Sequence, residues 1–105
     1  MSTTIALTHK HYTDEHLAEV TEEMKTLGAP AIRCIWSEMY GIWMAVEGCH
    51  RLRAAYELGL TPTIIDISDD EQVTYQYDGY DITVDVIDLA EELTDNAPRT
   101  KLLDF

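Results

Sequence analysis

The chain has 105 residues, which is enough for one small domain with a single core. Apolar residues make up 46% of it, so a globular fold needs no disulfide or metal staple. Seven basic and twenty acidic side chains give a net charge of -13. Because so acidic a surface repels a nucleic-acid backbone, we do not expect direct DNA binding.

No apolar run approaches the length of a membrane span, which is about 20 residues. The first residues, MSTTIALTHKHYT, lack the charged-then-apolar pattern of a signal peptide. We therefore expect a cytoplasmic protein without membrane association. Two cysteines, Cys34 and Cys49, do not make a disulfide framework, and in a reducing compartment both are expected to be thiols.

The first half of the chain predicts a strand, a helix and a hairpin. Residues 3 to 7 suit a short strand, and residues 13 to 27 carry a single apolar stripe at helical spacing. Thr13 is a good N-cap for this helix. Residues 31 to 36 and 42 to 46 look like the two strands of a hairpin. The second of these strands is almost wholly apolar, which favours a place in the middle of a sheet.

The second half of the chain predicts a helix over residues 49 to 58 and a strand over residues 63 to 67, which suggests a crossover connection. Residues 73 to 84 suit a hairpin around a tight Asp-Gly turn. From Val86 the apolar spacing changes to that of a short amphipathic helix. Residues 96 to 105 are expected to form a loose tail, whose apolar side chains could dock on the rest.

Acidic residues are concentrated between residues 66 and 95, which we call the acidic region. It contains eleven acids and neither Lys nor Arg. The acids are Asp66, Asp69, Asp70, Glu71, Asp78, Asp81, Asp85, Asp88, Glu91, Glu92 and Asp95. The simplest interpretation is solubility. The alternatives are an acidic face for a basic protein partner, or mimicry of nucleic acid.

The sequence Gly48-Cys49-His50-Arg51, which we call the GCHR box, lies between an apolar strand and a helix. A helix start offers free N–H groups and partial positive charge to an anion. Gly48 permits a tight turn and close approach of a ligand. Arg51 adds a fork of donors suited to phosphate, and His50 can donate one or two hydrogen bonds. The box therefore predicts a phosphate cradle, although a glycine before a helix is also common in ordinary turns.

Cys49 has two interpretations. Beside a helix N-terminus, His50 and Arg51, its thiolate is favoured and it could react as a nucleophile. Alternatively it is a small residue that fills a tight place. Cys34 lies among apolar strand residues, which favours a structural role.

Histidines 9, 11 and 16 precede or begin the first predicted helix. No nearby Cys or second carboxylate motif supports a structural zinc site, so we expect no metal site there. Lys10 and His11 could instead supply positive charge for an anionic ligand.

Residues 48 to 67, GCHRLRAAYELGLTPTIIDI, resemble the ParB/sulfiredoxin superfamily. ParB partition proteins carry Gly-Glu-Arg-Arg-x-Arg-Ala-Ala after a strand. The positions that match it here are Gly48, Arg51, Arg53, Ala54 and Ala55. Sulfiredoxins carry Phe-Gly-Gly-Cys-His-Arg, whose last four residues match the GCHR box. The likeness covers about residues 3 to 67, which leaves residues 68 to 105 as an acidic extension with a hairpin and a helix.

The resemblance implies an α+β fold, with a small mixed β-sheet flanked by helices, in a single domain of residues 1 to 105. It implies that the box binds the phosphates of ATP or CTP with Mg²⁺. Cys49 would be the nucleophile, as in sulfiredoxins, and His50, Arg51 and the matching Arg53 would hold phosphate. Polar residues after the first strand also hold the nucleotide in relatives, and Lys10 and His11 occupy that place here.

Three functions therefore remain open. The first is a nucleotide-phosphate-binding domain that hydrolyses a nucleotide or transfers its phosphoryl group. The second is a sulfiredoxin-like, ATP-dependent cysteine-sulfinic acid reductase that uses Cys49. The third is a non-catalytic module whose acidic region binds a basic protein.

Overall fold

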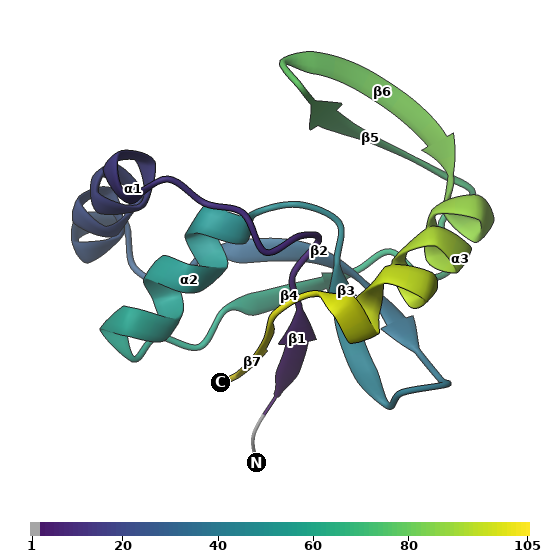
Figure 1. Ribbon diagram of the computed structural model, residues 1–105, viewed down its shortest axis with the longest axis horizontal. Coiled ribbons are helices and arrows are strands. Elements are labelled where there is room, and N and C mark those ends of the chain that lie inside the picture. The colour runs from purple at the N-terminus through teal and green to yellow at the C-terminus, as the bar shows by residue number, and fades with distance from the viewer. Residues whose placement is uncertain (1–2) are drawn as a thin grey trace.

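The computed structural model describes residues 3 to 105, so the first two residues of the predicted domain lie outside the described residues. Within that range the chain forms an α+β fold, as predicted, with three α-helices, a five-stranded sheet and a separate hairpin (Figure 1). In chain order the elements are β1 (Thr4–Ala6), α1 (Asp14–Leu27), β2 (Ala31–Ser37), β3 (Ile42–Ala45), α2 (Cys49–Leu58), β4 (Thr63–Asp66), β5 (Gln72–Tyr77), β6 (Tyr80–Asp85), α3 (Val86–Asn96), the 3-10 turn η1 (Ala97–Arg99) and β7 (Leu102–Asp104).

The main sheet is mixed and has the strand order β4-β2-β3-β1-β7. The apolar strand β3 lies in its middle, as predicted. β2 and β3 form the predicted antiparallel hairpin, with Trp36 opposite Trp43. The helix α2 then returns the chain to the far side of β2, where β4 pairs with β2 in parallel. The expected crossover connection is therefore present.

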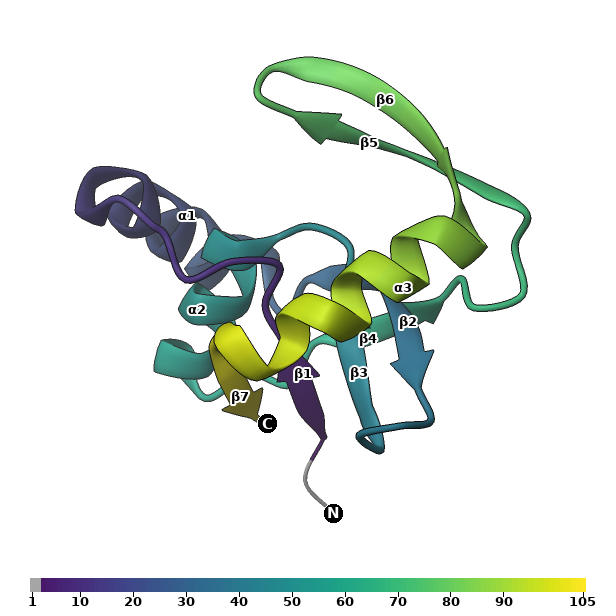
Figure 2. The ribbon, with the colours of Figure 1, turned by 45° about the vertical axis from the view of Figure 1, so that its right-hand side comes forward.

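Helices cover both faces of this sheet (Figure 2). Successive strand residues point to opposite faces, so Cys34 and Ile35 of β2 belong to different apolar clusters. Cys34 packs with Leu52 of α2 on one face, and Ile35 packs with Leu89 of α3 on the other. α1 packs against α2 through Met24. Within the described residues no helix is long and apolar enough to cross a membrane.

The prediction of a loose tail over residues 96 to 105 is wrong. Residues 97 to 99 form η1, and β7 pairs antiparallel with β1 at the edge of the sheet. Leu103 is 5% exposed and completes the apolar cluster under α2. A strand of three residues is too short to show a periodic pattern, so its place depends on β1, which offers it an unpaired edge.

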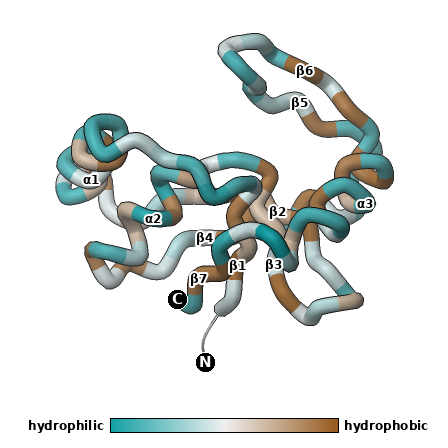
Figure 3. The backbone as a smooth tube through the Cα atoms, in the orientation of Figure 1, coloured by the Kyte–Doolittle hydropathy of each residue, from teal (hydrophilic) through white to brown (hydrophobic). Residues whose placement is uncertain are grey.

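The hairpin of β5 and β6 stands away from the main sheet in both views (Figures 1 and 2). Its turn is the predicted Asp78-Gly79 pair, whose φ angles of 52° and 83° suit the tight turn that matches strand twist. Along β6, apolar positions alternate with more hydrophilic ones (Figure 3). Because successive strand residues point to opposite faces, one face of the hairpin carries the apolar and aromatic residues. These residues are Val73, Tyr75 and Tyr77 of β5, opposite Val84, Ile82 and Tyr80 of β6.

The docking of β7 gives a first test of this fold. Leu103→Ala should lower the free energy of unfolding by ~2–4 kcal/mol, because it leaves a cavity beneath α2. Leu102, its neighbour on the same strand, is 48% exposed, so Leu102→Ala should cost about 1 kcal/mol or less. Urea unfolding of both variants measures the difference. Equal losses would mean that β7 is not packed as described.

Candidate functional site

The GCHR box forms the turn from the middle strand of the sheet into α2, as predicted. Gly48 is the N-cap residue of α2 and has φ of 87°, a backbone conformation that side chains rarely adopt. A Cβ at this position would also lie 2.8 Å from Cδ1 of Ile32, so another residue would have to displace that buried side chain. Among the described residues no side chain caps α2, and its first turn contains no acid. Its N–H groups can therefore serve an anion.

A cleft of about 1130 Å³ lies between the box, α1, α3 and the β5-β6 hairpin. Its lining includes the whole GCHR box and all four histidines of the chain, His9, His11, His16 and His50. The predicted site residues Arg53 and Lys10 lie outside this lining. The structure thus gathers five of the seven predicted residues around one cleft.

The side chain of Arg51 is held only loosely beside the box. Its Nη1 donates a hydrogen bond to the carbonyl oxygen of Ala31 at 3.3 Å, and its Nη2 lies 3.9 Å from Oε1 of Glu47. The guanidinium packs over Gly48, and the side chain is 42% exposed. Arg51 can therefore turn toward a ligand in the cleft without breaking a strong contact.

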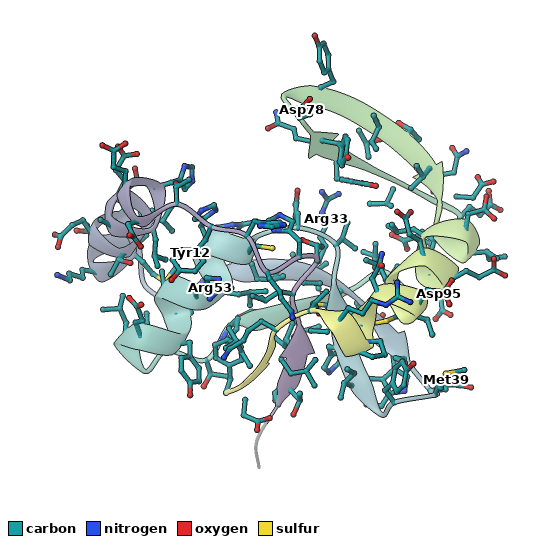
Figure 4. All side chains as sticks on the ribbon, viewed as in Figure 1. Tyr12, Arg33, Met39, Arg53, Asp78 and Asp95 are labelled. Atoms are coloured by element: carbon teal, nitrogen blue, oxygen red, sulfur yellow. The ribbon has the colours of Figure 1, made fainter. Side chains whose placement is uncertain are left out.

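Arg33, which sequence reasoning missed, is held far more firmly. Its Nη2 and Nε donate to Oε1 of Glu47 at 2.7 and 3.1 Å, and its Nη1 donates to the carbonyl oxygen of Thr74 at 2.8 Å. The guanidinium therefore joins β2, the residue before the box and the hairpin, beneath which it lies (Figure 4). The one available signal was a lone charge in an otherwise apolar strand, AIRCIW.

His50 contacts the start of α1. The backbone N–H of Thr13 donates to its Nε2 at 3.2 Å, which places the ring proton on Nδ1, and its ring lies 4.3 Å from that of His16. Burial lowers the pKa of His50 below its ordinary value, and the nearby charges of His16, His9 and Arg53 lower it further. His50 therefore offers a neutral Nδ1–H donor at neutral pH.

Arg53 holds the segment between β1 and α1 against α2. Its Nη2 donates to the carbonyl oxygen of Lys10 at 2.9 Å, and its guanidinium carbon lies 4.2 Å from the ring centre of Tyr12. The two side chains lie side by side in Figure 4. Lys10 and His11 line a smaller hollow of about 360 Å³ along this segment. In this structure Arg53 thus positions the wall of the cleft that His9 and His11 provide.

The two cysteines differ in their surroundings. The sulfur of Cys49 is hydrogen bonded with the hydroxyl of Thr8 at 2.8 Å, and Cys49 lines the cleft although it is only 6% exposed. Cys34 is fully buried, and burial, followed by the charge of Asp66, raises its pKa to about 12. Cys34 therefore has the structural role predicted for it, whereas Cys49 lies within reach of a small reagent that enters the cleft.

No family model, curated protein or solved structure matches this chain. The resemblance to the ParB/sulfiredoxin superfamily accordingly rests on the residues of the box and of α2. Across residues 3 to 105 no group of three or more His, Cys, Asp or Glu side chains is arranged to hold a metal ion by itself.

Alkylation tests the accessibility of the two thiols. With iodoacetamide near pH 8, Cys49 of the folded protein should be modified well before Cys34, because Cys34 is fully buried and remains a protonated thiol. Mass spectrometry of the peptides measures the order. In urea both cysteines should react. Earlier modification of Cys34 would contradict the described packing.

The pKa of His50 predicts a pH dependence of stability. Because the folded state lowers this pKa, the unfolded state takes up a proton first as the pH falls, so stability is lost. Between about pH 7.5 and about pH 5.5, His50→Gln should lose less stability than the parent protein. Urea midpoints measure this, with His11→Gln as the control. The same pH slope in parent and His50→Gln proteins would rule the linkage out.

Proposed function

We propose that the cleft binds the phosphate groups of a nucleotide at the amino-terminal end of α2. The observation that carries the proposal is the meeting of three features in one place: an uncapped helix start, the loosely held guanidinium of Arg51, and an open cleft. Ligand sites commonly have volumes of about 300–1,000 Å³, so the cleft can take a whole nucleotide. The ParB/sulfiredoxin-like fold suggested by the sequence is part of this proposal.

The roles of the box residues follow from their contacts. Arg51 is the main phosphate ligand, because it can leave its weak contact with Glu47 for a more highly charged anion. The N–H groups around Cys49 and the Nδ1–H of His50 add donors. Glu47 would repel a phosphate, but the two hydrogen bonds from Arg33 offset its charge.

ATP or CTP with Mg²⁺ remains the ligand proposed from the resemblance. Mg²⁺ is usually held by one or two carboxylates together with the phosphates of the substrate. Glu47 is the carboxylate beside the box, but it is already paired with Arg33, so the phosphates of the nucleotide would supply most of the ligands of the metal. The resemblance further suggests that the bound nucleotide is hydrolysed or that its phosphoryl group is transferred.

We rank phosphate binding above the reductase function. A sulfinic acid reductase of this kind needs Cys49 to reach a protein substrate, whereas Cys49 is only 6% exposed and its sulfur is hydrogen bonded with Thr8. Both cysteines are free thiols, which fits the cytoplasmic location proposed from the sequence.

A second candidate function is binding of a basic protein by the acidic region. All eleven of its acids are exposed, and none forms an ion pair within residues 3 to 105. Unpaired charges of one sign favour a partner of the other sign. This function predicts that a Lys- and Arg-rich peptide binds, and that added salt weakens the binding.

Arg51→Ala tests the phosphate site. A nucleotide at a hundredfold excess over its dissociation constant stabilises the folded state by ~2.7 kcal/mol, which should raise the melting temperature of the parent protein by several degrees. With ATP or CTP and Mg²⁺, the variant should show little or none of this rise while it melts near the parent temperature without ligand.

Lys101→Ala is the matched control, because it removes the same charge from an exposed position outside the cleft. It should keep the full rise. The proposal fails if nucleotide leaves the parent protein unchanged, or if Arg51→Ala responds as the parent does.

A further inference from the structure

The side chains on the apolar face of the β5-β6 hairpin become more exposed toward the turn. Val73, at the root, is 6% exposed and packs in the core beneath α3. Tyr75 is half-buried at the edge of the same cluster. Next to the turn, Tyr77 and Tyr80 are 66% and 74% exposed. The apolar face thus extends beyond the body of the protein, with two tyrosines that the described residues leave largely uncovered.

Tyr75 and Tyr77 line the same cleft as the GCHR box. They belong to β5, whereas the box belongs to the turn before α2, so the two groups form separate walls. The lining of the cleft also includes apolar side chains, among them Met24 of α1 and Leu89 and Leu93 of α3. The cleft therefore joins a wall suited to an anion with a wall suited to an aromatic group.

Charge gives the two walls opposite preferences. Asp78 at the hairpin turn and Glu92 of α3 also line the cleft, and their carboxylates repel phosphate. Arg51 and the start of α2 attract it at the box. The hairpin wall is also fixed in place, since Arg33 donates to the carbonyl oxygen of Thr74, next to Tyr75. Glu23 and Glu47 also line the cleft, but Arg33 offsets the charge of Glu47. A ligand with an anionic end and a planar apolar end is therefore favoured with its anionic end at the box.

We propose that Tyr75 and Tyr77 form the subsite for the aromatic base of the nucleotide whose phosphates lie at the GCHR box. This inference rests on the phosphate site proposed above and adds the hairpin to it. Tyrosine rings stack on the flat face of any base, so the subsite recognises a planar aromatic group. A ligand with phosphates alone makes no use of it.

The experiment compares tripolyphosphate with ATP and CTP, each with Mg²⁺, by isothermal titration calorimetry. In the parent protein the tighter of the two nucleotides should bind at least about tenfold more strongly than tripolyphosphate, because it adds the stacking contacts. Tyr77→Ala should remove most of this advantage and leave tripolyphosphate binding unchanged. Tyr77→Phe keeps the ring and should keep the advantage.

Tyr80→Ala is the matched control. Tyr77 and Tyr80 are opposite each other across the turn, so either substitution removes the same cross-strand pair, but only Tyr77 lines the cleft. Tyr80→Ala should therefore bind nucleotide as the parent does. If tripolyphosphate binds as tightly as both nucleotides, or if the two alanine variants lose affinity equally, the base subsite is wrong while the phosphate site stands. If none of the three ligands binds, the proposed phosphate site is wrong, and so is the base subsite that rests on it.

Discussion

The shape of the cleft depends on the hydrogen bonds that the guanidinium of Arg33 donates. Within residues 3 to 105 the β5-β6 hairpin shares no strand pairing with the main sheet. Its place is set by apolar packing at its root and by the hydrogen bond from Arg33 to the carbonyl oxygen of Thr74. The same guanidinium holds Glu47, the residue before the box. One side chain of β2 therefore links the two walls of the cleft.

The protein has a net charge of -13, so it can bind an anion only where positive charges close to the site outweigh the repulsion from its acidic residues. All seven basic residues lie outside the acidic region, which is confined to β4, the hairpin, α3 and the loops between them. At physiological ionic strength charges are screened over about 8 Å, so distant acids contribute little at the box. The uneven distribution therefore lets the surface around the box attract anions, although Asp78 and Glu92 of the acidic region line another part of the same cleft.

The parts of the fold that the sequence predicted are those set by local chemistry. Thr13 caps α1 by accepting a hydrogen bond from the N–H of His16, and the Asp-Gly turn and Gly48 each adopt the backbone that their residue types favour. The contacts that define the cleft were not predictable in this way. Arg33 and Glu47 are 14 positions apart, and Arg53 and Lys10 are 43 apart, so pairing them requires knowing which segments meet. β7 was missed for the same reason, since its partner is β1.

The pairing of β1 with β7 makes the order of folding depend on synthesis. Thr4 and Asp104 are 100 positions apart, so a ribosome takes roughly 5 to 20 seconds to reach the second strand after it has made the first. During that time the outer edge of β1 presents unpaired N–H and C=O groups, which can pair with another chain. The sheet gains its last strand only when residues 102 to 104 emerge from the ribosome. Pairing between segments so far apart in the sequence is slow. The edge of β1 is therefore exposed for at least as long as the synthesis of the chain between the two strands takes.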